Sequence, residues 1–344
     1  MKIASIDYIK VYVPWKTSFA EPMRRWRAMN GTTPEDEDAY VLIRVRTDEG
    51  LVGWGEGGRS LDEVRTVGDR LLGQNPMALD AHNLQPPFLH AVFDLAGQAL
   101  GVPAGLLLGG RFRDEVPLAF WSPYLPPTET AKLAEEGAAA GFKVHKIKAR
   151  PHDCTEQVQA ISESAGPDYA IRIDPNETFR LPATTMRIDQ EIAEYNVECL
   201  EDPVPKAHPE WYAMLRQKCY TPLAVHTHDP ELILRMARLD ATDYVNVGGT
   251  PSETRAAAAV AQAAGCPVWV QSEGHCLEIA AAFNIHLAAA LPNATLPADI
   301  LHFLREAPIT REPLVPIGGM VRVPEGPGLG IEVDEAALQA YRVG

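Results

Sequence analysis

The sequence contains few cysteines, and none stands close to another. Its 344 residues include five, an odd number without paired spacing, and Cys199, Cys219 and Cys266 lie in or beside apolar segments. This usage excludes the disulfide-stabilised class of small secreted proteins and is typical of thiols kept reduced. We therefore expect a cytoplasmic protein.

Long hydrophobic runs and clusters of basic residues are also missing. Nowhere do 18 uncharged apolar residues follow one another, and the first residues alternate like a β-strand instead of forming a signal peptide. The 31 basic residues are outnumbered by 46 acidic ones, which gives a net charge of −15. Nucleic acid and anionic membranes are therefore disfavoured as partners, and we expect a soluble, unprocessed chain.

The sequence does contain a regular alternation of strands and helices. From Val116 onward, eight segments that read as β-strands are separated by helical stretches, which predicts a parallel sheet that can close into a barrel. The strand candidates are VPLAFW, KVHKIKAR, YAIRIDPN, VECLEDPV, TPLAVHTH, DYVNVGG, PVWVQSEG and TLPADI. Residues 1 to about 60 instead predict a β-meander with a long polar loop after its first strand, and residues 61–112 predict helices.

Chemically active residues end four consecutive predicted strands. Lys148, Asp174, Glu201 and His226 recur at intervals of 26, 27 and 25 residues, about one strand-plus-helix unit. The carboxyl ends of barrel strands meet at one face, where such folds build their active sites. The sequence therefore predicts an enzyme.

Two lysines stand on the second barrel strand. Because Lys146 and Lys148 are two residues apart, their side chains project from the same face, which is the barrel interior. Two ammonium groups that are close and partly desolvated disfavour each other's charge, which lowers a pKa and lets a lysine act as a base. We expect this effect here.

The next strand ends offer metal ligands. Asp174 and Asn176 in IDPN, and Glu201 in LEDP, supply the oxygens that Mg²⁺ requires. Where a third oxygen ligand is expected, His226 and His228 share one face, so either could reach a metal, orient a ligand or bind substrate. We predict a metal site made by Asp174, Glu201 and His226, with Asn176 and His228 near the substrate.

Five motifs of the sequence, taken in their order and spacing, resemble the enolase superfamily, in the branch of mandelate racemase and muconate lactonizing enzyme. They are KIK, the Asp of IDPN, the Glu of LEDP, the helical DLAGQALGVPAGLLLGG and the closing PEGPGLGIEVDE. The resemblance spans nearly the whole chain. It implies an α/β fold, a modified (β/α)₇β TIM barrel at residues 113–310, with an α+β capping domain formed from the N-terminal region, 1–112, and the C-terminal tail, 311–344. It also implies removal of the proton α to a carboxylate, with Mg²⁺ stabilising the resulting enediolate.

Carried over residue by residue, the resemblance makes Lys148 the base and Lys146 its companion. It makes Asp174 and Glu201 the first two ligands of one Mg²⁺ ion per site. The family's third ligand is a carboxylate on the fifth strand, and His226 stands nearest that place. This substitution leaves Zn²⁺ or Mn²⁺ as alternatives to Mg²⁺.

The later strands depart from the family pattern. Racemases of the family pair a His on the seventh strand with an Asp on the sixth, but Gln271 stands where that His would fall and DYVNVGG lacks the Asp. A cycloisomerase-type lysine on the sixth strand is missing too. We therefore expect a one-sided site in which Lys148, Glu273 or His275 returns a proton and Gln271 contacts the substrate. We interpret Asp299, after the eighth strand, as a turn residue.

An acidic protein that processes carboxylates needs local positive charge. Arg24, Arg25 and Arg27 in MRRWRAM lie in the part of the cap that closes over such sites in the family, and arginine can grip a carboxylate with two hydrogen bonds. Trp54, in VGWGEGG, resembles the second capping loop. It would pack on a substrate or on the domain interface.

The sequence thus predicts a Mg²⁺-dependent lyase or isomerase that acts on a small-molecule carboxylate. The first choice of reaction is the dehydration of a sugar acid. We also expect the protein to be a homo-oligomer. Three alternatives stay open. One is an epimerase or cycloisomerase of the same family, and another is a zinc-dependent hydrolase in which His226 and His228 hold a water-activating metal. The third is a barrel that binds an acid without catalysis.

Overall fold

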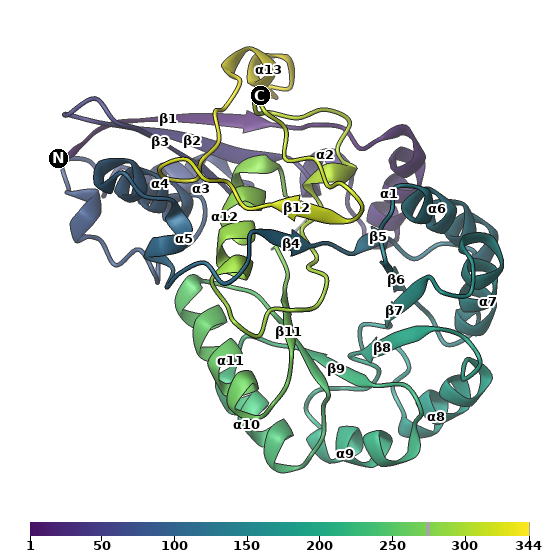
Figure 1. Ribbon diagram of the computed structural model, residues 1–344. Helices are drawn as coiled ribbons and strands as arrows, with labels where there is room; N and C mark the ends of the chain where they lie inside the picture. The colour runs from purple at the N-terminus through teal and green to yellow at the C-terminus, as the bar shows by residue number, and fades with distance from the viewer. Residues whose placement is uncertain (273–275, 344) are drawn as a thin grey trace.

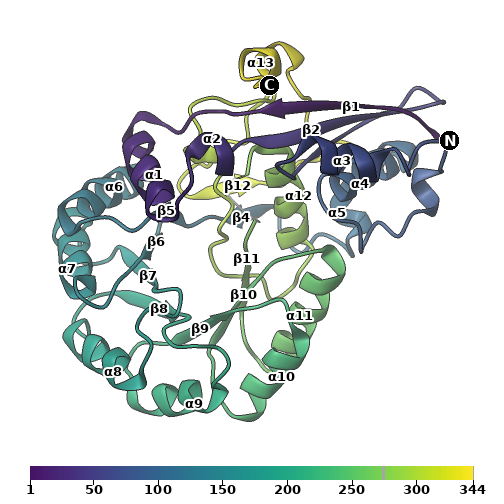
Figure 2. The same cartoon turned by 180° about the vertical axis from the view of Figure 1, so that it is seen from behind.

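The structure, a computed structural model, describes residues 1–272 and 276–343. A small antiparallel sheet with its helices lies against a ring of parallel strands that is covered by helices on the outside (Figures 1 and 2). This arrangement confirms the predicted fold class, a modified TIM barrel with an α+β cap. All five cysteines are free thiols, and in the described part of the chain no helix is long and apolar enough to cross a membrane.

The cap is built on the predicted meander. Its strands are β1 (Ile3–Val11), β2 (Tyr40–Thr47) and β3 (Val52–Glu56), paired antiparallel in the order β1-β2-β3. Gly50 turns the chain between β2 and β3 at a φ of 89°, which favours glycine. Its helices after β3 are α3 (Leu61–Gly68), the 3₁₀ turn η1 (Pro76–Ala78), α4 (Phe88–Leu100) and α5 (Ala104–Leu107).

The segment between β1 and β2 is helical, so the prediction of a long polar loop was wrong. It forms α1 (Thr17–Met29) and the short α2 (Pro34–Glu37). Phe19, Met23 and Trp26 recur at helical spacing, and the first two are fully buried in the barrel core. The sequence pattern concealed this face because charged residues surround the three apolar ones.

Seven strands form the parallel barrel sheet. They are β5 (Phe120–Ser122), β6 (Val144–Lys148), β7 (Ala170–Asp174), β8 (Val197–Glu201), β9 (Leu223–His226), β10 (Tyr244–Val247) and β11 (Val268–Val270), in that spatial order. The predicted eighth strand contributes single bridges, from Ala298 to Leu118 and from Asp299 to Gln271. These bridges close the ring between β11 and the start of the barrel.

The predicted first barrel strand is divided between two sheets. Its first half, β4 (Glu115–Pro117), pairs antiparallel with β12 (Met320–Arg322) of the C-terminal segment, and only β5 joins the barrel. The C-terminal segment then reaches the cap, where the N–H of Leu329 donates to Asp94 of α4 at 2.9 Å. The 3₁₀ turn η2 (His302–Leu304) precedes this segment, and the helix α13 (Glu335–Ala340) near its end lies beside β1 in Figure 1.

Helices cover the outside of the barrel. They are α6 (Pro127–Ala139), α7 (Cys154–Ala165), α8 (Pro182–Glu191), α9 (Pro209–Lys218), α10 (Pro230–Arg238), α11 (Pro251–Ala263) and α12 (Glu278–Ala289). Most begin with proline, which has no N–H group. This costs nothing at the first helical position, because an N–H group there has no partner within the helix. Each helix therefore starts at a defined residue after its strand, and this fixes the loops that carry the polar strand ends.

Glu56, at the end of β3, joins the cap to the barrel. Its carboxylate is buried and accepts hydrogen bonds from the backbone N–H groups of Leu277, at 2.6 Å, and Ala280, at 2.9 Å, where α12 begins. Burial raises the pKa of Glu56 to about 7, although these two hydrogen bonds and the Arg305 charge oppose the shift. The cap and the barrel therefore share a buried carboxyl group that titrates near neutral pH.

We expect this carboxyl group to make the protein less stable as the pH rises. The pKa of this carboxyl group is about 7 in the folded chain against an ordinary value of 4.5, so the folded chain binds the proton more tightly. Its contribution to the free energy of unfolding therefore falls by roughly 3 kcal/mol as the pH rises from 4.5 to 7. Urea unfolding at pH 5 and pH 7.5 should show a smaller loss in Glu56→Gln than in the wild type. Glu332→Gln, at an exposed position, serves as the control, and equal losses in all three proteins would contradict the expectation.

Candidate active site

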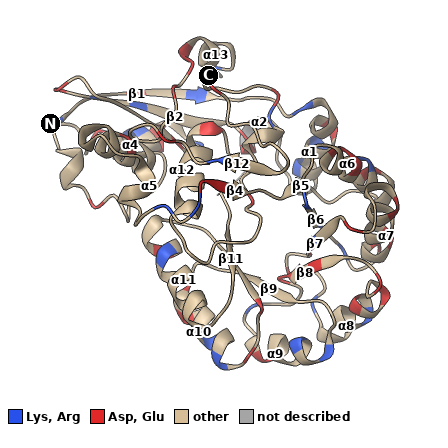
Figure 3. Ribbon diagram, viewed as in Figure 1, with Lys and Arg blue, Asp and Glu red and all other residues tan. Residues whose placement is uncertain are grey.

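The barrel interior holds a cluster of charged side chains at the carboxyl ends of its strands. Lys146 lies at its centre, with Nζ 2.7 Å from Oε2 of Glu201, 2.8 Å from Oδ2 of Asp299 and 3.3 Å from Oδ2 of Asp174. All four side chains are almost completely buried. Figure 3 shows the basic residues of β6 and the acidic residues of β8 on the same ring of strands. The strand period therefore brought together residues that are far apart in the sequence.

The expected lowering of a pKa by the neighbouring lysines was wrong for Lys146. Burial disfavours its charge, but the carboxylates of Asp299, Glu201 and Asp174 outweigh burial and raise the pKa of Lys146 well above its usual value. The prediction counted the two lysines and overlooked how many carboxylates surround them. The three carboxylates therefore favour the charged form of Lys146.

Lys148 lies at the surface of the cluster. Its Nζ is 2.5 Å from Oδ2 of Asp174, and its side chain is 16% exposed against 3% for Lys146. It lines a cavity of about 310 Å³ together with Asn176 and Gln271. Lys146 lines the same cavity, and Lys148 is the more exposed of the two lysines.

Asp174 is held as an anion. Burial favours its neutral form, but Lys148 and Lys146 outweigh burial and keep its pKa well below the usual range. Its Oδ1 accepts a hydrogen bond of 2.9 Å from the backbone N–H of Asn176. Asn176 has a φ of 49°, a left-handed conformation that asparagine tolerates better than most residues. This turn fixes the carboxylate between the lysines and the start of the loop.

A buried arginine supports the cluster from below. Arg172 donates to Oε2 of Glu198 at 2.7 Å and to Oδ1 of Asp299 at 3.3 Å, and its guanidinium carbon lies 3.8 Å from the centre of the Trp269 ring. Trp269 in turn donates to Asp299 at 3.0 Å. The interpretation of Asp299 as a turn residue was therefore wrong. Arg172 was overlooked, although it stands two residues before Asp174 and shares its strand face.

One group of side chains could hold a metal ion. Among the described residues, ligand atoms of Glu201, Asp202 and His226 all lie within 4.8 Å of one another. Burial lowers the pKa of His226 to about 4, which keeps the imidazole neutral, and burial raises the pKa of Glu201 to about 7 although Lys146 opposes the shift. Glu201 Oε2 is buried and accepts no hydrogen bond from any described group, although Lys146 is near. Two carboxylates and a neutral imidazole fit a divalent ion.

Neighbouring polar residues orient this group. Asn246 donates to Oε1 of Glu201 at 2.8 Å and to Oε1 of Gln271 at 3.1 Å. Lys206 donates to Asp202 at 2.9 Å, and Asp202 accepts the backbone N–H of His226 at 3.0 Å. The sequence argument missed Asn246, Asp202 and Lys206, although Asn246 stands on a predicted strand and Asp202 directly follows Glu201.

The remaining predicted site residues lie in different places. Gln271 lines the cavity, whereas His228 is exposed and is not part of the metal-binding group. Trp54 is buried in an apolar cluster that the cap shares with α12, which agrees with packing on the domain interface. Glu273 and His275 lie outside the described residues.

The three predicted arginines of the cap belong to α1. Arg27 forms an ion pair with buried Asp38 and lines the cavity beside Trp26. Arg24 pairs with Glu21, and Arg25 pairs with Glu129 of α6. The structure therefore brings Arg27 to the cavity and ties Arg24 and Arg25 to acidic partners on the outer surface.

Comparisons with known proteins agree with this geometry. The family described as "Enolase C-terminal domain-like" matches residues 129–337. An N-succinyl-L-Arg/Lys racemase of Bacillus cereus is 25% identical over 383 residues, which cover 100% of this chain and 98% of the racemase. A D-xylonate dehydratase of Haloferax volcanii is 28% identical, with 88% of this chain and 85% of the dehydratase covered. The crystal structure of an isomerase from Streptomyces coelicolor A3(2) has a TM-score of 0.80 at 28% identity, with 99% of this chain and 98% of the isomerase covered.

Proposed function

Because this chain belongs to the enolase superfamily, in the branch of mandelate racemase and muconate lactonizing enzyme, we propose that Lys148 removes the proton α to the carboxylate of a small hydroxy acid. Proteins similar to this chain are racemases, cycloisomerases, epimerases and dehydratases, so it is an isomerase or a lyase. The observation that carries the proposal is the position of Lys148, at the edge of the cavity and against the carboxylates beneath it.

The residues of the cluster have separate tasks in this reaction. Lys148 accepts the proton, because it is the more exposed of the two lysines that line the cavity. Lys146 stays charged and holds Asp174 and Glu201 in place. Arg27 lines the wall nearest the cap, where its guanidinium is paired with Asp38.

A divalent ion is part of the proposal. Glu201 and His226 would hold it, together with the carboxylate of Asp174 or of Asp202. Metal binding by the matched variants Asp174→Asn and Asp202→Asn would show which of the two carboxylates is the ligand. When bound, the ion supplies positive charge that offsets the charge developing on the substrate carboxylate. We propose Mg²⁺ as the resident ion, and the imidazole ligand makes Mn²⁺ or Zn²⁺ bind more tightly at this site than at one made of oxygen alone.

Dehydration of a sugar acid is the reaction we propose. The cavity is lined by polar side chains such as Asn176, Gln271 and Ser272, which suit hydroxyl groups. A similar protein is named D-xylonate dehydratase. After Lys148 has taken the α-proton, it gives this proton to the hydroxyl group on the adjacent carbon, which leaves as water. The resulting enol rearranges to a 2-keto acid.

The test is α-proton exchange in deuterated water. With Mg²⁺ or Mn²⁺ present, we expect the protein to exchange the α-proton of a sugar acid, followed by NMR, and to form a 2-keto acid. Metal removal with a chelator should abolish both, and added ion should restore them.

Other results of these experiments would indicate one of the alternative functions. Exchange without a keto acid would favour an epimerase or cycloisomerase. Stoichiometric zinc together with ester or amide hydrolysis would favour the hydrolase, and binding without exchange would favour a non-catalytic barrel. A cytoplasmic location, which the free thiols favour, completes the proposal.

A further inference from the structure

The pairing of the neighbouring strands β8 and β9 ends close to His226 (Figure 1). The N–H of Leu200 donates to the carbonyl of Pro222 at 2.9 Å, and the N–H of Asp202 donates to the carbonyl of Ala224 at 3.0 Å. In a parallel ladder, the next bond would run from the N–H of His226 to the carbonyl of Asp202. Among the described residues this bond is not formed, so the end of β9 needs other partners.

Asp202 turns its own carbonyl away from β9. Its φ is 47°, in the left-handed region that aspartate tolerates better than most residues, and its carbonyl accepts the N–H of Glu177, in the loop after β7, at 2.7 Å. The side chain of Asp202 takes the place of this carbonyl, because its Oδ1 accepts the N–H of His226 at 3.0 Å. A carboxylate thus continues the ladder where the backbone of β8 stops.

Lys206 holds the other peptide group of His226. Its Nζ donates to the carbonyl of His226 at 3.0 Å and to Oδ2 of Asp202 at 2.9 Å. The N–H and the carbonyl of His226 are therefore both bound by side chains, and these two side chains are paired with each other. The side chain of Asp202 is 3% exposed and that of Lys206 is 30% exposed, so the ion pair is largely shielded from solvent.

The imidazole ring of His226 has no comparable support. In the described part of the chain, the hydrogen bonds of His226 all involve its backbone, whereas a histidine that binds a metal usually donates its second ring N–H to a carboxylate or a carbonyl. The direction of the ring therefore depends on where the end of β9 is held. Asp202 is engaged in this task with both oxygens, one bound to the His226 N–H and the other to Lys206.

We propose that Asp202 and Lys206 are a positioning pair, which holds the backbone of His226 so that its imidazole points at the metal ion. An imidazole offers a ligand atom in one direction, whereas a carboxylate has two oxygens and several lone pairs. A small rotation of the backbone would therefore remove an imidazole from the ion more easily than a carboxylate. This inference rests on the proposed function and makes its metal site more specific, because Asp202 then acts through His226 and is not itself a ligand.

The test measures metal binding without turnover. Lys206→Met removes both hydrogen bonds of Nζ and keeps most of the length of the side chain. For chelator-treated protein, we expect the ratio of the Co²⁺ affinity to the Mg²⁺ affinity, measured by calorimetry, to fall by about 10–100-fold, the usual effect of losing a group that orients a metal ligand. Imidazole suits Co²⁺ better than Mg²⁺, whereas loss of the lysine charge alone would change both affinities by the same factor. Lys218→Met, at the exposed end of α9, is the control and should change neither affinity.

A spectroscopic measurement shows whether the imidazole is bound. In the Co²⁺ protein, a bound histidine gives a strongly shifted ring N–H signal in the proton NMR spectrum, and His226→Ala identifies the signal of this residue. We expect the signal in the wild type and in Lys218→Met, and its loss in Lys206→Met. Lys206→Arg, which keeps the charge and several donors, should restore part of the signal and of the affinity ratio.

Two results would overturn the positioning role. One is an unchanged affinity ratio or an unchanged signal in Lys206→Met, and the other is a wild type in which the His226 signal is missing. If Lys206→Met loses the signal as expected but the wild type exchanges no α-proton, only the proposed function is removed. Thermal unfolding shows whether each variant is folded. Lys206→Gln, whose amide can still donate to one of the two acceptors, should give an intermediate ratio and replaces Lys206→Met if that variant does not fold.

Discussion

Replacement of Lys148 by alanine is expected to slow α-proton exchange by about 10²–10⁴-fold, the usual contribution of a general base. Lys148 and Lys146 both line the reaction cavity of about 310 Å³ and contact Asp174, but Lys148 is 16% exposed against 3% for Lys146. We expect that Lys146 does not take its place, since three carboxylates raise its pKa and its side chain is only 3% exposed. The loss should fall mainly on kcat, because substrate binding depends on other groups.

The measurement is single-turnover exchange in deuterated water, with binding followed separately by calorimetry. Lys143→Ala is the matched control, since Lys143 immediately precedes β6 and is exposed. Lys148→Arg should stay nearly as slow as Lys148→Ala, because arginine keeps the charge but does not act as a base. Exchange in Lys148→Ala at the wild-type rate would remove Lys148 from the proposed mechanism.

The sequence could predict the part of the cluster that follows the strand period. Lys148, Asp174 and Glu201 each end a strand, and neighbouring parallel strands bring such residues to one edge. Asp299 escaped this argument because its segment forms single bridges instead of a regular strand. Its partner Arg172 is 127 residues away, and a pairing over such a distance leaves no periodic signal.

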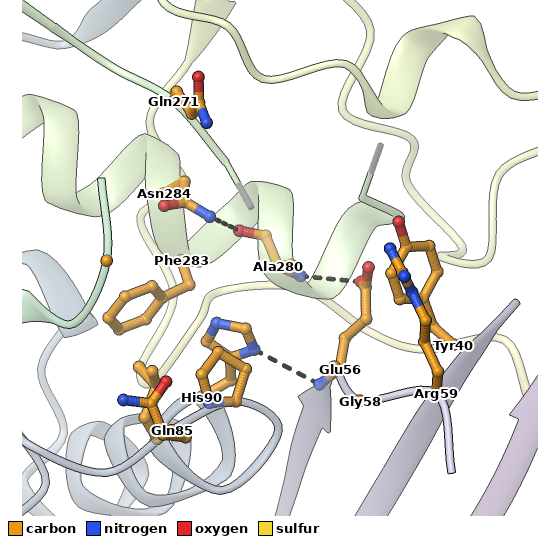
Figure 4. Close-up of a pocket in the computed structure, with 14 residues that line it drawn as sticks. Tyr40, Glu56, Gly58, Arg59, Gln85, His90, Gln271, Ala280, Phe283 and Asn284 are labelled. Atoms are coloured by element: carbon orange, nitrogen blue, oxygen red, sulfur yellow. Dashed lines mark hydrogen bonds between the residues drawn. The ribbon is translucent and has the colours of Figure 1, made fainter. Parts of the chain in front are cut away.

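The cap was less predictable than the barrel for a related reason. Its meander follows from local alternation and a glycine turn, but α1 is helical because Phe19 and Met23 are buried against the barrel. That is a tertiary contact, and it overrides a local preference for loop. A cavity between the cap and the barrel has the same origin, since its walls come from β3, α4 and α12 (Figure 4). Sequence patterns predict the elements, whereas the spaces between them depend on packing.

A second large effect is expected at Arg172. This side chain is fully buried between Glu198, Asp299 and the ring of Trp269. Arg172→Met would keep much of the volume but leave two carboxylates without their guanidinium partner. Removing one member of a buried ion pair costs about 3–5 kcal/mol, because the remaining charge stays in a poorly solvated place. We expect the free energy of unfolding to fall by that amount in urea titrations.

The control distinguishes a buried charge from a charge as such. Arg322→Met removes an exposed arginine whose side chain is 90% accessible and which lies 3.7 Å from Glu115, and surface changes of this kind stay within about 0.5 kcal/mol. Adding Glu198→Gln to Arg172→Met should recover part of the loss, since it removes one of the charges left unpaired. If Arg172→Met were as stable as Arg322→Met, the interior would have to solvate these carboxylates in another way. Asp299 would then not need Arg172 to hold it in position beside Lys146, and the site would not be a fixed network of charges.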